Sequence, residues 1–403
     1  MFNYVNIIKR FICNNRYKAK IKQLCKINGT RKIRVLFYVC ENSKWCYQSL
    51  YDLLASSKMF EPVIIVSVLK HVSDANNNAH NILAENYNFF KSKGMNVEYG
   101  YKDNRYINLK NFSPDIVFYE QPYGLPRTHN PYAVSTFALT CYCPYGLSYF
   151  NYKDSYKFKF HYCLFKNFID SEVNIARFET NINGASKNCI ATGYSKLDVY
   201  HDEIKLCPEN YWKDPSKIKI IYAPHHSFEA NTALLATFRQ NGKFILQQAK
   251  NHPETTWIFK PHPRFKLALA KNTIMSETEI EDYYSEWKKI GNVYTKGDYL
   301  NIFRTSDMMI TDCCSFLGEY LPTGKPLIRP VNPGCLSLNE LGEKVLEGQY
   351  QVCDNKELEN IFEQLIANND FKKNIRMDSI KYVLKETKSS EIIVEYIKGY
   401  LGI

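Results

Sequence analysis

The chain has 403 residues, of which 45% are hydrophobic and 15% aromatic, and its formal net charge is +11. This length suits two domains, and the apolar content excludes a disordered chain. No run approaches the roughly 18 to 20 apolar residues that span a bilayer, and Lys9 and Arg10 interrupt any signal-peptide core. The 13 cysteines form no Cys-x-x-Cys pair. We therefore expect a cytoplasmic protein in a reducing compartment.

The positive charge is concentrated at the N-terminus. Residues 1–40 contain ten lysine and arginine residues and no acid, and Phe2, Val5, Ile8 and Ile12 recur there at near-helical spacing. Residues 1–32 therefore form a basic leader, which either lies peripherally on an anionic membrane face or is a solvated tail or a helix packed on its own domain. The rest of the chain is close to neutral and carries no nucleic-acid-binding module, so no nucleic-acid partner is expected.

Strand and helix patterns alternate from residue 33 onward. Apolar, β-rich runs predict strands over 34–40, 62–69, 95–101, 115–120, 137–143 and 189–191, with helices over 45–56 and 79–93. Such alternation is typical of βαβ units and a parallel sheet. Residues 33–200 are therefore expected to form a first Rossmann-like domain.

A polar, proline-bearing stretch over 201–217 is the predicted linker, and a second alternating series follows it. Strands are predicted over 218–222, 256–260, 293–295, 308–311 and 326–329, and helices over 232–251, 277–289, 299–304 and 355–368. Residues 218–375 thus form a second domain, and a single helix over 378–401, within a C-terminal segment 376–403, can cross back to the first. We expect an α/β protein with two doubly wound domains facing a central cleft, a common place for ligands.

Several nucleotide and metal motifs are absent from the sequence. There is no Gly-x-Gly-x-x-Gly after the first strand, no Walker Gly-x-x-x-x-Gly-Lys-Ser/Thr, and no Asp-x-Asp. Dinucleotide redox chemistry and NTP hydrolysis are therefore unsupported, and no cofactor is expected.

Chemistry-bearing residues gather in three segments of the second domain: Tyr222–Ser227, Phe259–Pro263 and Thr311–Glu319. Each follows a predicted strand. In an open α/β sheet, ligands bind outside the carboxyl ends of the strands.

The third of these segments predicts an anion site. A helix that starts after a strand exposes free N–H groups, which suit phosphate. Thr311 and Ser315 can cap the helix or bond a phosphate oxygen, whereas Asp312 is expected to cap or orient its neighbours. Glu319 lies one turn beyond Ser315, where it can accept bonds from ribose hydroxyls. Ordinary helix capping by these residues is the alternative.

The other two segments supply cations and imidazoles. Lys260 and Arg264 can neutralise a diphosphate, and His262 can donate to a phosphoryl oxygen or protonate a leaving group, although the segment also reads as a rigid turn between prolines. Only one of His225 and His226 is expected to face the cleft. Metal ligation by this pair lacks a helical His-x-x-x-His and an acidic third ligand, so no metal site is expected.

The first domain offers one candidate of the same kind. Tyr145 and Gly146 follow the predicted strand over 137–143. Gly146 permits close backbone approach, and Tyr145 can hydrogen-bond a donor or acceptor substrate. An aromatic core turn is the other interpretation.

Several motifs of the second domain occur in a characteristic order. They are Tyr-Ala-Pro after a strand, Lys-Pro-His-Pro, Thr-Asp-x-x-Ser with an acid four residues later, and a downstream Gly-Lys-Pro. In this order they resemble the CDP-glycerol glycerophosphotransferases. These are teichoic-acid and capsule polymerases with a GT-B fold, and the resemblance covers residues 188–375. It implies a CDP-activated donor held by the second domain, with His262 at the diphosphate, Thr311, Asp312 and Ser315 at the phosphate-binding helix, and Glu319 at the ribose.

The chain departs from the family pattern at two places. His225-His226-Ser227 stands where the family has Thr-Trp-Arg, and Cys143-Pro-Tyr145-Gly146 replaces the His-Gly-Thr-Pro loop that carries the family's proposed base. The resemblance leaves the base open, with His225 or His226 as substitutes.

The resemblance implies a transferase that moves a phosphoalditol or related group to a hydroxyl of a bacterial surface polysaccharide or glycolipid acceptor. The alternatives are a nucleotide-sugar-dependent glycosyltransferase in capsule or lipooligosaccharide synthesis, and a non-catalytic GT-B-like binding protein.

Overall fold

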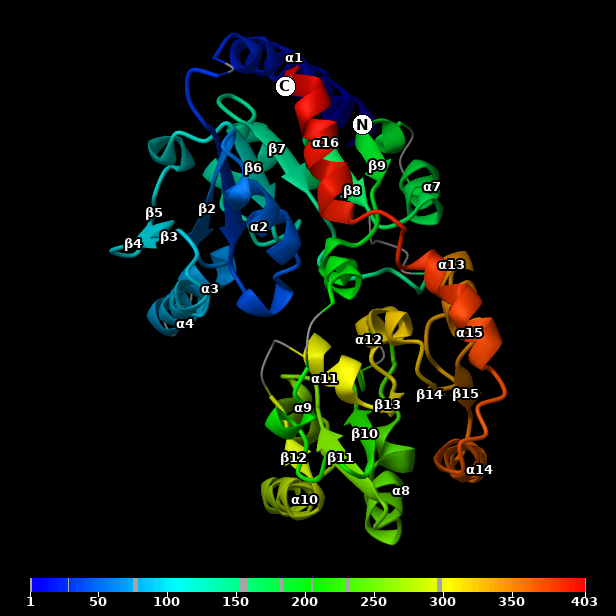
Figure 1. Cartoon of the computed structure of the whole chain (residues 1–403). Helices are drawn as coiled ribbons and strands as arrows, with labels where there is room; N and C mark the ends of the chain where they lie inside the picture. Colours follow the sequence, from blue (N-terminus) through cyan, green and yellow to red (C-terminus); the bar gives the residue numbers. More distant parts are fainter. Residues whose placement is uncertain are drawn as a thin grey trace. The chain divides into compact units, whose positions relative to one another are not determined.

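The structure is a computed structural model that describes residues 2–27, 29–74, 79–151, 159–181, 184–203, 206–229, 232–295 and 299–402. The chain folds as two compact units (Figure 1). Unit 1 comprises Met1–Gly146, Asp154–His201 and Lys385–Ile403, and unit 2 comprises Leu147–Lys153 and Asp202–Leu384. Of the predicted linker over 201–217, His201 falls in unit 1 and residues 202–217 fall in unit 2.

Unit 1 is built on a seven-stranded sheet with the order β3-β2-β1-β6-β7-β8-β9. Its strands are β1 (Ile33–Val39), β2 (Phe60–Val66), β3 (Val97–Tyr99), β6 (Ile116–Tyr119), β7 (Leu139–Tyr142), β8 (Lys166–Ile169) and β9 (Cys189–Ala191). All neighbouring pairs are parallel. The strand order reverses between β1 and β6, and this reversal is the switch point at which doubly wound sheets bind ligands. A separate hairpin pairs β4 (Tyr101–Lys102) with β5 (Arg105–Tyr106).

The helices of unit 1 come from both ends of the chain as well as from the crossovers. They are α1 (Phe2–Ile27), α2 (Gln48–Ser56), α3 (Lys70–Asp74), α4 (Ala79–Ser92), α5 (Pro131–Val134), α6 (Lys159–Tyr162), α7 (Glu172–Asn181) and α16 (Ser389–Leu401). The C-terminal helix α16 contacts α1 and α2, so the two chain ends meet on this unit (Figure 1).

Unit 2 contains a six-stranded parallel sheet with the order β12-β11-β10-β13-β14-β15. Its strands are β10 (Ile218–Ala223), β11 (Thr255–Phe259), β12 (Asn292–Val293), β13 (Met308–Thr311), β14 (Leu327–Pro330) and β15 (Tyr350–Val352). Counted along this unit the order is third-second-first-fourth-fifth-sixth, the arrangement of a doubly wound nucleotide-binding sheet. Its switch point lies between β10 and β13.

Eight helices of unit 2 are described. They are α8 (Phe238–Asn251), α9 (Phe265–Lys271), α10 (Glu277–Ile290), α11 (Leu300–Thr305), α12 (Cys314–Glu319), α13 (Glu340–Glu347), α14 (Asn355–Ile366) and α15 (Lys373–Ser379). The core between sheet and helices is aromatic, with Phe259 stacked on Trp287 of α10 at a centroid distance of 5.2 Å. This packing fixes the end of β11, from which the Lys-Pro-His-Pro segment leaves.

One predicted element is wrong: the single helix over 378–401. The structure has α15, a short 3-10 turn and then α16, with no α-helix over residues 383–388. The carboxylate of Asp198 accepts the backbone N–H groups of Ser389 at 2.7 Å and Ser390 at 2.8 Å. These bonds satisfy the free donors of a new helix start, so a separate helix begins at Ser389.

Within the residues described, no helix combines the length and apolar character that a bilayer crossing requires.

Candidate functional site

Hydrogen bonds join the three predicted segments at the carboxyl ends of β10, β11 and β13 in unit 2. The backbone N–H of Lys260 donates to the carbonyl of Tyr222 at 2.8 Å, and that of His262 donates to Pro224 at 3.1 Å. The hydroxyl of Thr311 donates to the carbonyl of Ala223 at 2.7 Å. The three segments therefore form one cluster beside the switch point of this sheet.

Asp312 fixes the position of the histidine-bearing loop. Its carboxylate is 5% exposed and accepts the backbone N–H of His225 at 2.6 Å. It also accepts the backbone N–H and the hydroxyl of Thr237, at 2.7 and 2.8 Å. Asp312 is thus a positioning residue that connects β13 to the loop after β10 and to the start of α8.

Three imidazole rings meet at this edge of the sheet. The rings of His226 and His262 are stacked with centroids 3.8 Å apart, and His225 lies 4.5 Å from the first and 5.2 Å from the second. All three are partly exposed. Both adjacent histidines therefore lie beside His262, while the expectation that only one of them faces a cleft stays a prediction.

The histidines are held neutral. Burial lowers the pKa of His262 to about 3, helped by the charges of His226, Arg264 and Lys260. Burial and then Arg264 lower the pKa of His226 to about 4. The pKa of His225 also lies well below its ordinary value, because of burial and of its two imidazole neighbours.

A hydrogen bond at Nδ1 selects the tautomer of His262. The backbone N–H of Arg264 donates to this nitrogen at 3.1 Å. Because Nδ1 accepts, the single proton of the neutral imidazole resides on Nε2. Nδ1 of His225 contacts the backbone N–H of Ser227 at 3.3 Å and the hydroxyl of Ser227 at 2.8 Å, so either tautomer fits that ring. His262 therefore presents an N–H donor, which suits an anion.

The same three histidines could also hold a metal ion by distance, since their candidate ligand atoms lie within 4.8 Å of one another. A metal bound at Nε2 needs the lone pair that this atom has given up to a proton in His262. The tautomer of His262 therefore favours an anionic ligand over a metal.

Lys260 is held inside unit 2. Its side chain is 5% exposed, and its ammonium lies 4.8 Å from the ring centroid of Tyr299 and 5.7 Å from that of Phe316. Cation–π contacts of this kind stabilise a buried ammonium. The buried ammonium of Lys260 thus contributes positive charge to this edge of the sheet.

The remaining predicted residues of unit 2 lie at different depths. Arg264 is exposed and precedes α9. Ser315 is partly exposed near the start of α12, where the N–H of Cys313 is already satisfied by Thr311 at 3.0 Å. Glu319 is 1% exposed and accepts a hydrogen bond from Tyr299. The predicted contacts of Ser315 with phosphate and of Glu319 with ribose stay predictions.

In unit 1, Tyr145 belongs to a polar cluster that also contains Lys44. The hydroxyl of Tyr145 lies 2.9 Å from that of Tyr123, and the ammonium of Lys44 lies 5.0 and 5.3 Å from the ring centroids of Tyr123 and Tyr145. Lys44 also donates to the side chain of Gln121 at 2.6 Å. An added Cβ on Gly146 would meet nothing within 4 Å among the described residues, so no close contact with them requires a glycine there.

A buried carboxyl group, absent from the predicted site residues, lies at the switch point of unit 1. Glu120 follows β6 and is 1% exposed; its Oε2 accepts the N–H groups of Cys40 at 2.9 Å and Glu41 at 3.0 Å. Its Oε1 is closed off from solvent and has no hydrogen-bond partner among the described residues. Burial raises the pKa of Glu120 to about 8, against the opposing effect of the two N–H donors and Lys44. An acid at the end of a predicted strand was the signal that could have found it.

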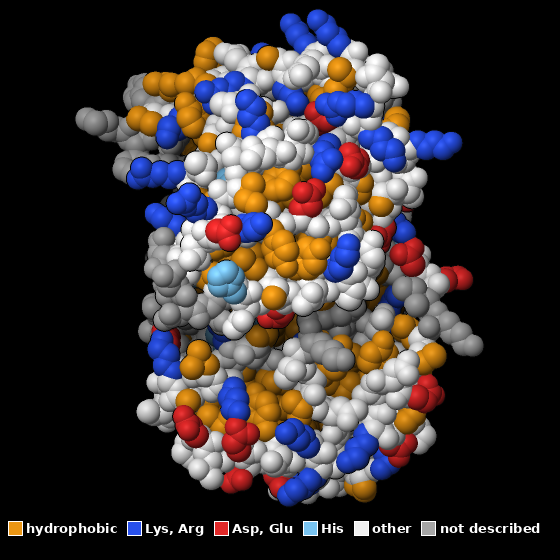
Figure 2. All heavy atoms as spheres, turned by 90° about the vertical axis from the view of Figure 1, so that its left-hand side faces the viewer, with side chains coloured by type: hydrophobic (Ala, Val, Ile, Leu, Met, Phe, Trp, Pro, Cys, Tyr) orange, Lys and Arg blue, Asp and Glu red, His pale blue; other side chains and the backbone are white. Residues whose placement is uncertain are grey.

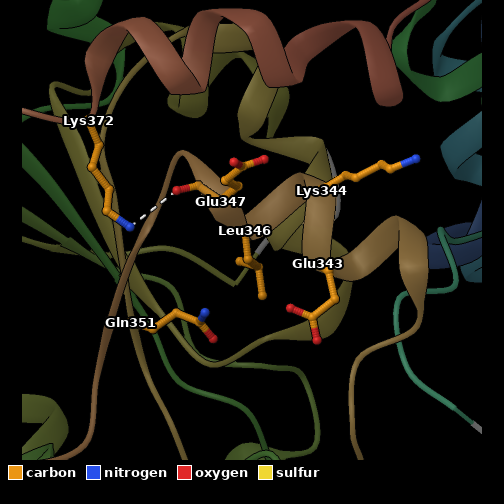
Figure 3. Close-up of a pocket in the computed structure, with 6 residues that line it drawn as sticks. All are labelled: Glu343, Lys344, Leu346, Glu347, Gln351 and Lys372. Carbon is orange, nitrogen blue, oxygen red and sulfur yellow. Dashed lines mark hydrogen bonds between the residues drawn. The ribbon is translucent and has the colours of Figure 1, made fainter.

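Two cavities lie elsewhere. One, of about 380 Å³ in unit 2, is lined by residues of α13 and β15 together with Lys372, which donates to the carbonyl of Glu347 at 3.1 Å (Figure 3). The other, of about 480 Å³ in unit 1, is bordered by Lys9, Tyr123 and Tyr132 among others. Neither is lined by a histidine of the cluster.

Comparison with known proteins finds no matching family model and no matching curated protein. Solved structures do match. A UDP-GlcNAc 2-epimerase from Neisseria meningitidis bound to UDP-GlcNAc is similar with a TM-score of 0.59 and 15% identity, over 91% of this chain and 100% of that one. The S. aureus MnaA–UDP co-structure gives 0.57 and 14%, over 92% and 97%. The wall teichoic acid polymerase TagF gives 0.56 and 12%, over 100% and 99%.

At these identities the likeness shows the fold alone. The chain has a GT-B-type fold with two Rossmann-like domains, as the sequence predicted. What these proteins bind or make does not follow for this chain from the fold, because one fold can carry many activities.

Proposed function

We propose that the chain is a transferase that takes a group from a nucleoside-diphosphate-linked donor, specifically a phosphoalditol or related group from a CDP-activated donor. The acceptor is a hydroxyl of a bacterial surface polysaccharide. The observation that supports this most is the histidine cluster His225, His226 and His262 at the switch point of unit 2, with an Nε2–H donor on His262. The motif order that resembles the CDP-glycerol glycerophosphotransferases supplies the donor class.

In this proposal the histidines act on the diphosphate. The acceptor oxygen forms a bond to the phosphorus of the transferred group, and the bond to the bridging oxygen breaks, so that CMP leaves. Negative charge grows on the leaving phosphate, where Nε2–H of His262 can donate to it. Positive charge from Arg264 and Lys260 assists without any covalent intermediate.

The proton of the acceptor hydroxyl needs a base, and we propose His225 or His226 for it, since both rings lie beside His262. A neutral imidazole keeps one nitrogen lone pair that can accept this proton. Tyr145, in the polar cluster of unit 1, is proposed as an acceptor contact.

The protonation state of Glu120 can be measured without knowing the substrate. A buried carboxyl with a raised pKa keeps its proton in the folded state while the unfolded state loses it, so stability falls as pH rises from about 4.5 towards 8. Glu120→Gln removes this loss, and we expect it to be more stable than the wild type by on the order of 3 kcal/mol at pH 7. The measurement is urea unfolding of both proteins at several pH values.

Glu395→Gln is the matched control, because Glu395 is 71% exposed on α16 of the same unit. Its effect should stay within about 0.5 kcal/mol at every pH. Parallel pH profiles for wild type and Glu120→Gln would contradict a raised pKa at Glu120.

The donor class is tested by nucleotide release. Full-length protein is incubated with CDP-glycerol, other CDP-alditols, UDP-sugars or GDP-sugars, with a polysaccharide acceptor, and the nucleotide product is identified. We expect CMP. Release of UDP or GDP would instead support a nucleotide-sugar glycosyltransferase. This alternative is worth testing because two structures of similar fold hold UDP or UDP-GlcNAc. Saturable nucleotide binding without release from any donor would indicate a non-catalytic binding protein.

A further inference from the structure

The basic N-terminal segment is a helix packed on unit 1. The side chains of Cys13, Tyr17 and Leu24 on α1 are at most 2% exposed. The hydroxyl of Tyr17 lies 2.5 Å from that of Thr140 on β7, and Lys20 forms an ion pair of 3.1 Å with buried Asp115. One face of α1 is thus fixed against the domain, and the opposite face points outward.

The N-terminal part of this outward face is apolar. Ile7, Ile8 and Phe11 are 55%, 58% and 66% exposed, and Val5 beside them is 50% exposed. Four of the ten large hydrophobic side chains that stand exposed in the described part of the chain thus lie within seven consecutive residues. A cluster of this kind on one helix usually marks a surface that is covered in use.

The C-terminal part of the same face is cationic. Lys18, Lys22 and Lys26 follow one another at four-residue spacing, so they form one stripe along the helix, and all three are exposed. Like charges at this spacing destabilise a helix. No acid occurs in residues 1–40, and none of the three lysines is in an ion pair with a described residue, so the fold offers no compensation.

The outward face of α1, defined by Val5, Ile7, Ile8, Phe11, Lys18, Lys22 and Lys26, thus joins an apolar end to a lysine stripe. Figure 2 shows hydrophobic side chains among lysine and arginine side chains on the upper part of the face it draws. An amphipathic surface of this composition complements an anionic lipid bilayer, which takes apolar side chains at the acyl boundary and lysines at its headgroups.

We infer that the outward face of α1 docks unit 1 on an anionic membrane surface, with the apolar end inserted at the interface and the lysine stripe on the headgroups. The interaction is peripheral and reversible. It does not depend on the proposed transfer reaction.

The test is co-sedimentation of the full-length protein with vesicles of phosphatidylcholine, with and without phosphatidylglycerol. We expect binding only when phosphatidylglycerol is present, and weakening as salt is added. The triple variant Lys18→Gln/Lys22→Gln/Lys26→Gln should lose roughly a hundredfold in partition coefficient. Ile8→Ser/Phe11→Ser should also reduce binding, although every charge is kept.

A control triple variant removes the same charge elsewhere: Lys58→Gln/Lys356→Gln/Lys373→Gln, all at exposed positions. It should bind as the wild type does. Equal binding of wild type and stripe variant, equal binding to vesicles without phosphatidylglycerol, or equal loss in the control variant would each overturn the inference. Circular dichroism of every variant checks that it is folded. If the triple stripe variant has unfolded, Lys18→Gln and Lys22→Gln are tested singly, and each is expected to lower the partition coefficient roughly fivefold.

Discussion

Replacing His262 with alanine is expected to lower donor turnover by about 10²–10³-fold, because it removes an N–H donor from the charge that develops on the leaving phosphate. The backbone N–H of Arg264 holds Nδ1 of this ring as an acceptor, which leaves the proton on Nε2. The measurement is the rate of nucleotide release at saturating donor. His262→Gln keeps an N–H donor near the position of Nε2 and should retain more activity than His262→Ala.

His252→Ala is the matched control for this experiment. His252 follows α8 in the same unit, and its ring contacts Glu254 and Glu363 rather than the cluster. Its turnover should equal that of the wild type. If His262→Ala retained full turnover, the assignment of the donor diphosphate to this edge of unit 2 would be wrong.

Asp312→Ala is expected to destabilise the protein by roughly 3–5 kcal/mol, more than any other single change considered. The carboxylate accepts hydrogen bonds from His225 and Thr237 in a place that is 5% exposed. Alanine leaves two backbone N–H groups without a partner where water cannot replace it. Urea unfolding measures the change, provided that the slope of the transition is unaltered.

Asp312→Asn should lose less stability than Asp312→Ala, because asparagine keeps one oxygen as an acceptor. Some loss remains, because its amide NH₂ group faces an N–H donor and cannot accept from it. Asp307→Ala is the control: its carboxylate is 44% exposed and pairs with Lys219, so a loss of at most about 1 kcal/mol is expected. A loss of under 1 kcal/mol in Asp312→Ala would show that the carboxylate does not hold the histidine loop.

The second sheet could be predicted from the sequence because its central strands are mainly apolar and are followed by polar residues. Ile218–Ala223 and Met308–Thr311 match their predicted ranges to within one residue. β8 was not predicted, since Lys166 and Asn167 interrupt its apolar pattern, and β15 is only three residues long. The break before α16 could not be foreseen either, because it depends on Asp198, nearly 200 residues away in the sequence.

The segments that form the candidate site could be predicted from the sequence, but the burial of their side chains could not. Strand-end motifs identified the three segments that hydrogen bonds join in unit 2. The enclosure of Lys260 depends on Tyr299 and Phe316, which are distant in sequence, and the burial of Glu319 depends on the packing of the same aromatic residues. Local pattern carries no information about such contacts. Glu120 shows the same limit, since its pKa arises from burial that only the fold reveals.

The central claim is that the histidine cluster of unit 2 binds the diphosphate of a nucleotide. Calorimetric titration of the full-length protein with CDP and with CMP tests it most directly, in wild type and in His262→Ala, over a range of pH. We expect CDP to bind at least tenfold more tightly than CMP, with the preference reduced in His262→Ala. Because a bound anion raises the pKa of a neutral imidazole, CDP binding should also strengthen as the pH falls. Equal affinities for CDP and CMP, or an unchanged preference in His262→Ala, would contradict the claim.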